Sequence, residues 1–119
     1  GCLIDTEIIM IQVYHYSYDY DEDGHQVDDI WSISRGDIDT VKRAWDGKTP
    51  DIAYLPVALV DTDNLETAFM LTNHIDESWT LNDGVDALLT KVRSTSVGDV
   101  MVRGDKRFLV DRMGFTELK

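Results

Sequence analysis

The sequence predicts an α+β fold: a mixed, mainly antiparallel sheet of four or five strands with two main helices on one face. Segments rich in β-branched and aromatic residues alternate with segments in which apolar residues recur every three or four positions. A Gly-Asp dipeptide between two apolar runs near the C-terminus indicates a tight hairpin. The length of 119 residues, 43% of them hydrophobic, predicts a single domain over residues 1–119.

Two strands are predicted before residue 35. In the segment 8–18 (IIMIQVYHYSY), isoleucine and valine alternate with methionine and tyrosine, which is typical of a central strand that is apolar on both faces. The Asp23-Gly24 pair indicates a hairpin that leads into a short second strand over 27–34. Residues 1–9 overlap the start of the first strand, and they are interpreted as a tag remnant or an N-terminal extension.

A helix followed by a strand is predicted next. Apolar residues spaced by three and four indicate a helix over 36–45, with Asp37 as its N-terminal cap. The apolar run 52–61 is predicted as a strand, and Pro56 places that strand at an edge or at a bulge because proline cannot donate a ladder hydrogen bond. Since a helix precedes this strand, we expect it to run parallel to the first strand through a right-handed crossover.

A second main helix is predicted over 63–74. Asp63 and Glu66 have the spacing of a capping box. The buried stripe of this helix is predicted to consist of Leu65, Ala68, Phe69 and Thr72. Residues 86–91 are predicted to add one or two further helical turns.

The C-terminal hairpin has the clearest local pattern. We expect 99–103 to pair with 107–113 around Gly104-Asp105, followed by a short closing segment through Gly114 and Phe115. Across this turn, Val100 and Val102 are predicted to meet Phe108 and Val110.

The formal charge of −12 restricts the classes of partner. The electrostatic field of this negative charge repels nucleic acid and anionic membranes, and it attracts a basic protein or a divalent cation. The chain has no apolar run long enough to span a membrane, and its first residues lack the pattern of a signal peptide. The lone Cys2 has no intramolecular disulfide partner, which fits a reducing compartment.

One segment resembles the start of a calcium-binding loop. Asp19, Asp21, Asp23 and Gly24 match D-x-D-x-D-G, in which carboxylates converge on the ion and glycine allows the sharp turn. The twelfth position, where a bidentate glutamate belongs, is Ile30. A solvated acidic turn and a degenerate Ca²⁺ site therefore both stay open, and no other cofactor is predicted.

No catalytic group is predicted from the residue spacing. The three histidines, His15, His25 and His74, lack zinc-ligand spacing. The Ser94–Ser96 cluster has no G-x-S-x-G motif around it, and such clusters commonly bond to the local backbone. We therefore favour a non-enzymatic protein and leave an enzyme as an alternative.

Two segments carry a family resemblance. LETAFMLTNHIDESW at 65–79 and RSTSVGDV at 93–100, followed by GFTE at 114–117, resemble a group of small, mostly uncharacterised proteins of actinobacterial phages and related mobile elements. The second segment is also similar to the YodL-like domain. This resemblance implies a phage accessory protein in the cytoplasm of a bacterial host, and it implies no catalytic residue.

The polar and aromatic residues of these motifs form the candidate ligand or partner site. Its predicted members are Thr72, Asn73, Asp76, Trp79, Ser94, Ser96 and Asp99. Each also has a structural interpretation, as a cap, a turn residue or a core side chain.

Three functions stay open at this point. The first is a phage accessory protein that binds a host or phage protein through an acidic surface. The second is a DNA mimic directed against a defence system. The third is a small-molecule-binding protein or enzyme that uses the 94–99 loop.

Overall fold

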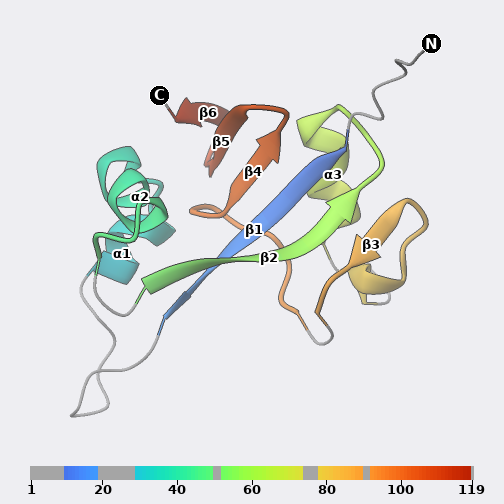
Figure 1. Cartoon of the computed structure of the whole chain (residues 1–119), viewed down its shortest axis with the longest axis horizontal. Helices are drawn as coiled ribbons and strands as arrows, with labels where there is room; N and C mark the ends of the chain where they lie inside the picture. The colour runs from blue at the N-terminus through green and yellow to red at the C-terminus, as the bar shows by residue number, and fades with distance from the viewer. Residues whose placement is uncertain (1–9, 19–28, 50–51, 74–77, 90–91, 119) are drawn as a thin grey trace.

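The computed structural model confirms the α+β class. It describes residues 10–18, 29–49, 52–73, 78–89 and 92–118. One sheet of six strands, in the order β3-β2-β1-β4-β5-β6, crosses the molecule (Figure 1). Its strands are β1 (Ile11–Tyr18), β2 (Ile52–Val60), β3 (Val85–Ala87), β4 (Val100–Arg103), β5 (Lys106–Asp111) and β6 (Gly114–Leu118). The helices are α1 (Asp29–Ser34), α2 (Ile38–Trp45), α3 (Leu65–Leu71) and a 3₁₀ turn, η1 (Trp79–Leu81).

All the described strand pairs are antiparallel, so the predicted parallel crossover is wrong. β2 begins opposite the end of β1, where Tyr18 pairs with Ile52. Since β2 starts at the end of the sheet where β1 stops, the chain has no need to cross back over the sheet. The strand count rises from the expected four or five to six because β3 and the closing segment β6 also join the sheet.

Pro56 lies beside a bulge, as predicted. Val13 pairs with Ala58 and Tyr14 pairs with Pro56, which leaves Val57 as the extra residue of β2. A bulge accommodates a residue that has no N–H to give to the ladder, and it bends the strand locally.

The helices lie on both faces of the sheet, in contrast to the single covered face that we expected. Ile11 and Val13 of β1 pack in one core with α3 and η1. Tyr14 and Tyr16 pack in the second core, beneath α1 and α2. β1 is apolar on both faces, and each face therefore gains when a helix covers it. No helix in the described ranges is long and apolar enough to cross a membrane.

Two segments have a different secondary structure from the one predicted. In 27–34, residues 29–34 form α1 rather than a strand, which places Ile33 in the second core. In 86–91, residues 85–87 form β3 rather than a helical turn, because Val85 and Ala87 pair with Val60 and Ala58 of β2. Both segments are short, and local preference in short segments yields readily to tertiary pairing.

The helix caps correct two details. α3 is capped by Asn64, whose side chain accepts from the Thr67 N–H at 2.9 Å, and not by the predicted Asp63–Glu66 box. Asp37 does occupy the N-cap position of α2, but its carboxylate accepts from the Thr40 hydroxyl rather than from a backbone N–H.

The C-terminal hairpin forms with the predicted Gly104-Asp105 turn but with different facing residues. Phe108 lies opposite Met101, and Leu109 lies opposite Val100. A two-residue loop places residues 103 and 106 opposite each other, so Phe108 and Val110 share a face with Met101 and not with the two valines. Gly114–Leu118 continues as an edge strand.

Candidate functional site

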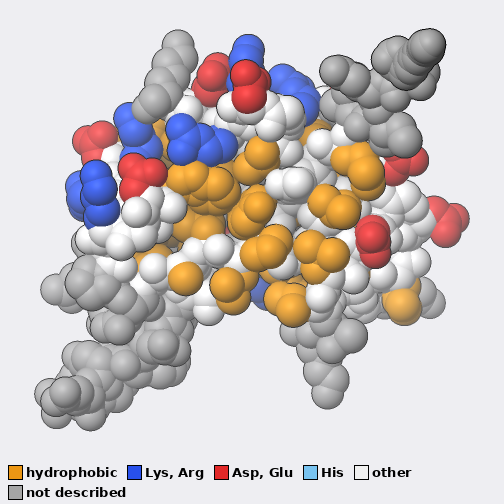
Figure 2. Space-filling view, in the orientation of Figure 1, with side chains coloured by type: hydrophobic (Ala, Val, Ile, Leu, Met, Phe, Trp, Pro, Cys, Tyr) orange, Lys and Arg blue, Asp and Glu red, His pale blue; other side chains and the backbone are white. Residues whose placement is uncertain are grey.

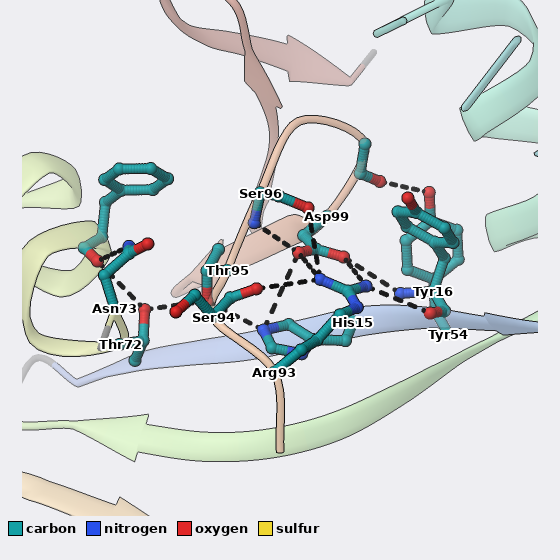
Figure 3. Close-up of polar contacts among 12 residues, drawn as sticks. His15, Tyr16, Tyr54, Thr72, Asn73, Arg93, Ser94, Thr95, Ser96 and Asp99 are labelled. Carbon is teal, nitrogen blue, oxygen red and sulfur yellow. Dashed lines mark hydrogen bonds and ion pairs between the residues drawn. The ribbon is translucent and has the colours of Figure 1, made fainter. Parts of the chain in front are cut away.

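The predicted site residues converge on the segment 92–99, which enters β4 on the face of the sheet that α3 covers (Figure 3). Of the predicted set, the described members near this segment are Thr72, Asn73, Trp79, Ser94, Ser96 and Asp99. Asp76 lies outside the described residues, as do Asp19, Asp21 and Asp23 of the calcium motif. Among the described residues, no three His, Cys, Asp or Glu side chains gather as a metal site.

Asp99 is the centre of the cluster and is completely buried. Its Oδ1 accepts from the Tyr16 N–H at 3.1 Å and from Arg93 Nη2 at 2.7 Å. Its Oδ2 accepts from the Ser96 N–H and from Arg93 Nη1, both at 2.7 Å. Four donors therefore surround the carboxylate, which compensates the cost of burying its charge.

Arg93 and Asp99 together complete the edge of β1. β4 pairs with β1 only as far as Tyr14, opposite Val100. Beyond that point the N–H of Tyr16 donates to Asp99, and the C=O of Tyr16 accepts from Arg93 Nη2 at 3.2 Å. Two side chains thus take the place that a longer β4 would fill, and we call this arrangement the β1 edge clamp.

The surroundings of Arg93 keep it charged and oriented. Its guanidinium lies 4.7 Å from the centre of the Tyr16 ring, and Nη1 also donates to the Ser94 C=O at 3.1 Å. Burial alone lowers the pKa of Arg93, but the hydrogen bonds and the charge of Asp99 outweigh burial and raise it. The two parallel hydrogen bonds from one side chain to the Asp99 carboxylate require arginine, since lysine has a single point charge.

Gly98 allows the segment to pass close to α1. Its φ is +100°, and a Cβ atom at this position would lie 2.5 Å from the carbonyl oxygen of Ile33. The hydroxyl of Tyr54 donates to the Gly98 C=O at 2.5 Å, and burial raises the pKa of Tyr54. Position 98 of the motif therefore requires glycine for two reasons: its φ is positive, and a Cβ atom there would clash with Ile33.

A second chain of hydrogen bonds joins α3 to β1. Thr72 Oγ1 donates to the Ala68 C=O at 2.8 Å, and Thr95 Oγ1 donates to Thr72 Oγ1 at 2.8 Å. His15 Nε2 lies 2.8 Å from Thr95 Oγ1. Both threonine hydroxyls already donate their protons, Thr72 to the Ala68 C=O and Thr95 to Thr72. His15 Nε2 must therefore carry a proton and donate it to Thr95 Oγ1. In the neutral imidazole, a proton on Nε2 leaves the lone pair on Nδ1.

Nδ1 of His15 is buried and has no hydrogen-bond partner among the described residues. Desolvation lowers the pKa of His15 to about 4, against the opposing attraction of Asp99, and Arg93 lowers it further. A proton on Nδ1 would have no acceptor, so the protonated form is poorly accommodated in the fold.

This burial predicts a dependence of stability on pH. The folded-state pKa of about 4 lies below the unfolded value of 6.5. The folded chain therefore binds fewer protons between these values, and the stabilisation is complete above pH 6.5 and lost as the pH falls towards 4. Urea unfolding at a series of pH values should show a loss of up to roughly 3 kcal/mol from this group.

The substitution His15→Gln should flatten that dependence, because glutamine has an N–H to give to Thr95 but does not titrate. His25→Gln makes the same chemical change elsewhere and serves as the control. An unchanged slope between pH 4 and 6.5 in His15→Gln would contradict the assignment.

Trp79 holds the start of the segment, and Asn73 caps the end of α3. The Trp79 indole is completely buried and donates to the Arg93 C=O at 2.8 Å. The amide of Asn73 donates to the Phe69 C=O at the end of α3. Both residues have the structural contacts expected of a core side chain and of a helix cap.

Sequence reasoning missed four members of this cluster: His15, Tyr16, Tyr54 and Arg93. Arg93 was the nearest to being found, since it begins the R-S-T-S-V-G-D-V motif. The three residues from β1 and β2 lie 45 to 84 positions before Asp99 in the sequence, and no local pattern links them to it.

No family model, curated protein or solved structure matches this chain.

Proposed function

We propose that this chain is a non-enzymatic phage accessory protein that binds a basic host or phage protein in the host cytoplasm. The observation that carries the proposal is the saturation of Asp99 by four donors. In the R-S-T-S-V-G-D-V motif, Arg93, Gly98 and Asp99 stabilise the fold, and their groups are already occupied by contacts within it. The resemblance to small phage proteins supports the same proposal.

The distribution of charge along the chain indicates where such a partner would bind. The stretch 19–29 contains six of the 23 acidic residues and no lysine or arginine. In contrast, α2 and its C-cap carry charges of both signs, and Asp39 and Asp46 flank Lys42 and Arg43 there. A dense run of one sign attracts a basic surface more strongly than a mixed helix does.

The test is capture of proteins from an actinobacterial host lysate at moderate salt. The triple variant Asp21→Asn, Glu22→Gln, Asp23→Asn removes three charges from the acidic stretch. We expect it to lose a basic protein that the wild type retains, because the encounter depends on opposite charge. Rising salt should release the same protein.

The matched control removes three charges elsewhere, at Asp39, Asp46 and Asp83, which are exposed side chains. This control variant should keep the captured protein. If both triple variants lose the captured protein equally, the interaction depends only on net charge. If both retain it, the acidic stretch is excluded as the binding element.

A further inference from the structure

β6 is the outermost strand of the sheet, and β5 is its only neighbour among the described strands (Figure 1). Asp111 and Gly114 face each other across a two-residue turn, which makes them a hydrogen-bonded pair, and such pairs alternate along the two strands. Phe115 and Glu117 occupy the positions in between. Their backbone N–H and C=O groups therefore point away from β5, towards the place that a seventh strand would occupy.

A pocket opens beside this edge, on the face of the sheet that α3 covers. It has a volume of about 330 Å³, and Phe69 and Met70 of α3 form one wall. Val110 and Phe115 form the other wall, and the rings of Phe115 and Phe69 meet edge to face at 6.5 Å between their centres. Met70 is largely exposed. The pocket therefore presents apolar surface to a side chain that arrives next to Phe115.

Charged side chains of both signs surround the apolar part of this edge. Figure 2 shows acidic and basic side chains together along the upper border, where Figure 1 shows β5 and β6. Arg112 lies in the turn that leads into β6, and Glu117 lies near the other end of the strand. Glu66 borders the pocket from the first turn of α3. A partner at this edge thus needs its own charges in a defined order along the strand.

Glu117 is the charge that an added strand would meet most directly. It lies opposite Phe108, which lies opposite Met101 of the core that α3 covers, so Glu117 projects on the same face as the pocket. Arg103 and Lys106 lie on this face next to the β4–β5 turn, but neither forms an ion pair with Glu117. The guanidinium of Arg103 instead lies 5.0 Å from the centre of the Phe108 ring. An added strand would approach the Glu117 carboxylate from the open side.

We propose that β6 binds an extended segment of a partner protein as a seventh, antiparallel strand. A bulky apolar residue of that segment lies opposite Phe115, and its side chain enters the pocket. A lysine or arginine lies opposite Glu117, two residues earlier in the partner. The outward backbone groups of Phe115 and Glu117 bond to the partner, as in other peptide complexes of edge strands. This site lies apart from the acidic stretch 19–29 in the sequence, and the proposal does not depend on that stretch.

A second copy of the chain does not meet these requirements. In an antiparallel partner, the basic residue comes first and the apolar residue follows two positions later. The segment 114–119, GFTELK, contains no such pair. The β6 strand of a second copy therefore cannot place a cation at Glu117 and an apolar side chain at Phe115 together, and the partner is a different chain.

The probe is the capped heptapeptide acetyl-Ser-Thr-Lys-Thr-Leu-Thr-Ser-amide, titrated to millimolar concentration into the ¹⁵N-labelled chain. Threonine favours an extended backbone, and the lysine and leucine have the proposed spacing. We expect the amide resonances of Phe115 and Glu117 to shift most and their hydrogen exchange to slow, because their N–H groups become hydrogen-bonded. The amides of β3, the other edge strand, are the internal control and should not shift.

Two N-methylated peptides distinguish strand pairing from simple adhesion. In the proposed register, the leucine N–H points to β6 and the N–H of the threonine before it points to solvent. N-methylation of that leucine should weaken binding about tenfold or more, since a hydrogen bond is lost and the methyl group enters the strand interface. N-methylation of that threonine should leave the affinity nearly unchanged.

The reversed peptide, with leucine before lysine, has the same composition and tests the order of the two side chains. Antiparallel pairing then places lysine at Phe115, nearer to Arg112, and leucine at Glu117. We expect this peptide to bind several-fold more weakly, because the apolar pocket receives a charge and the carboxylate receives none. Equal affinity of the two peptides would contradict the proposed order.

Substitutions in the chain test the side-chain contacts. Met70→Lys places a charge in the apolar wall and should weaken binding about tenfold. Leu81→Lys makes a similar change at another exposed apolar residue, on η1, and should have no effect. Glu117→Lys should weaken binding of the lysine peptide and favour the peptide in which glutamate replaces lysine.

The outcomes separate this proposal from the proposed function. The variant Asp21→Asn, Glu22→Gln, Asp23→Asn should bind the peptide as the wild type does, even if it loses the protein captured from lysate. Strand addition is overturned if Phe115 and Glu117 do not shift, if β3 shifts equally, or if both N-methylations weaken binding equally. Full binding by Met70→Lys would exclude the pocket as the site of the apolar side chain.

Discussion

Replacing Asp99 with alanine should lower the free energy of unfolding by about 3–5 kcal/mol, the range for breaking a buried charge pair. The carboxylate is completely buried and accepts four hydrogen bonds. Its loss leaves the N–H groups of Tyr16 and Ser96 without their acceptor and removes the counter-charge of Arg93. The measurement is urea unfolding near neutral pH.

Asp105→Ala is the matched control, because that aspartate is exposed in the hairpin turn. It should change stability by less than about 0.5 kcal/mol. A double-mutant cycle with Arg93→Ala separates the ion pair from the other contacts. Arg93 is 40% exposed, so water compensates part of its loss and we expect Arg93→Ala to cost less than Asp99→Ala. A cost below about 1 kcal/mol for Asp99→Ala would contradict the edge clamp.

Replacing Gly98 with alanine should destabilise the fold by about 3 kcal/mol or more through two additive effects. For a residue with a Cβ atom, a positive φ costs roughly 1–2 kcal/mol of conformational free energy. The new Cβ would also lie 2.5 Å from the carbonyl oxygen of Ile33 and 2.8 Å from its Cγ2. Relief requires α1 to move away from the sheet, and overpacking of this kind commonly costs about 1–3 kcal/mol.

Gly104→Ala separates these two effects. Gly104 also has positive φ, at +65°, but nothing lies within 4 Å of a Cβ atom there. It should therefore show only the backbone cost, and the difference between the two variants measures the contact with Ile33. Equal destabilisation by the two substitutions would show that α1 yields freely at Gly98.

Local patterns predicted most of the elements, and they failed where pairing decided the outcome. The helices at 38–45 and 65–71 and the hairpin around Gly104 follow from periodicity and turn residues, which act within a few positions. Residues 85–87 became a strand because β2 offered an unpaired edge, and no neighbour in the sequence indicates that edge. The same applies to the antiparallel direction of β2.

The candidate site divides in the same way. The motif at 93–100 drew attention to Ser96 and Asp99 from their residue types alone. The donors that surround Asp99 include Tyr16, which comes from a strand 83 residues earlier. A partner at that distance in sequence can be identified only when the sheet is assembled.

The sequence by itself determined the α+β class, the excess of acidic residues at 19–29 and the need for glycine at turns, because each depends on composition or on neighbouring residues. Only the tertiary structure decided that Asp99 and Arg93 complete the edge of β1. Hydrogen-bond register joins residues that lie far apart along the chain, and register is set by how whole strands align.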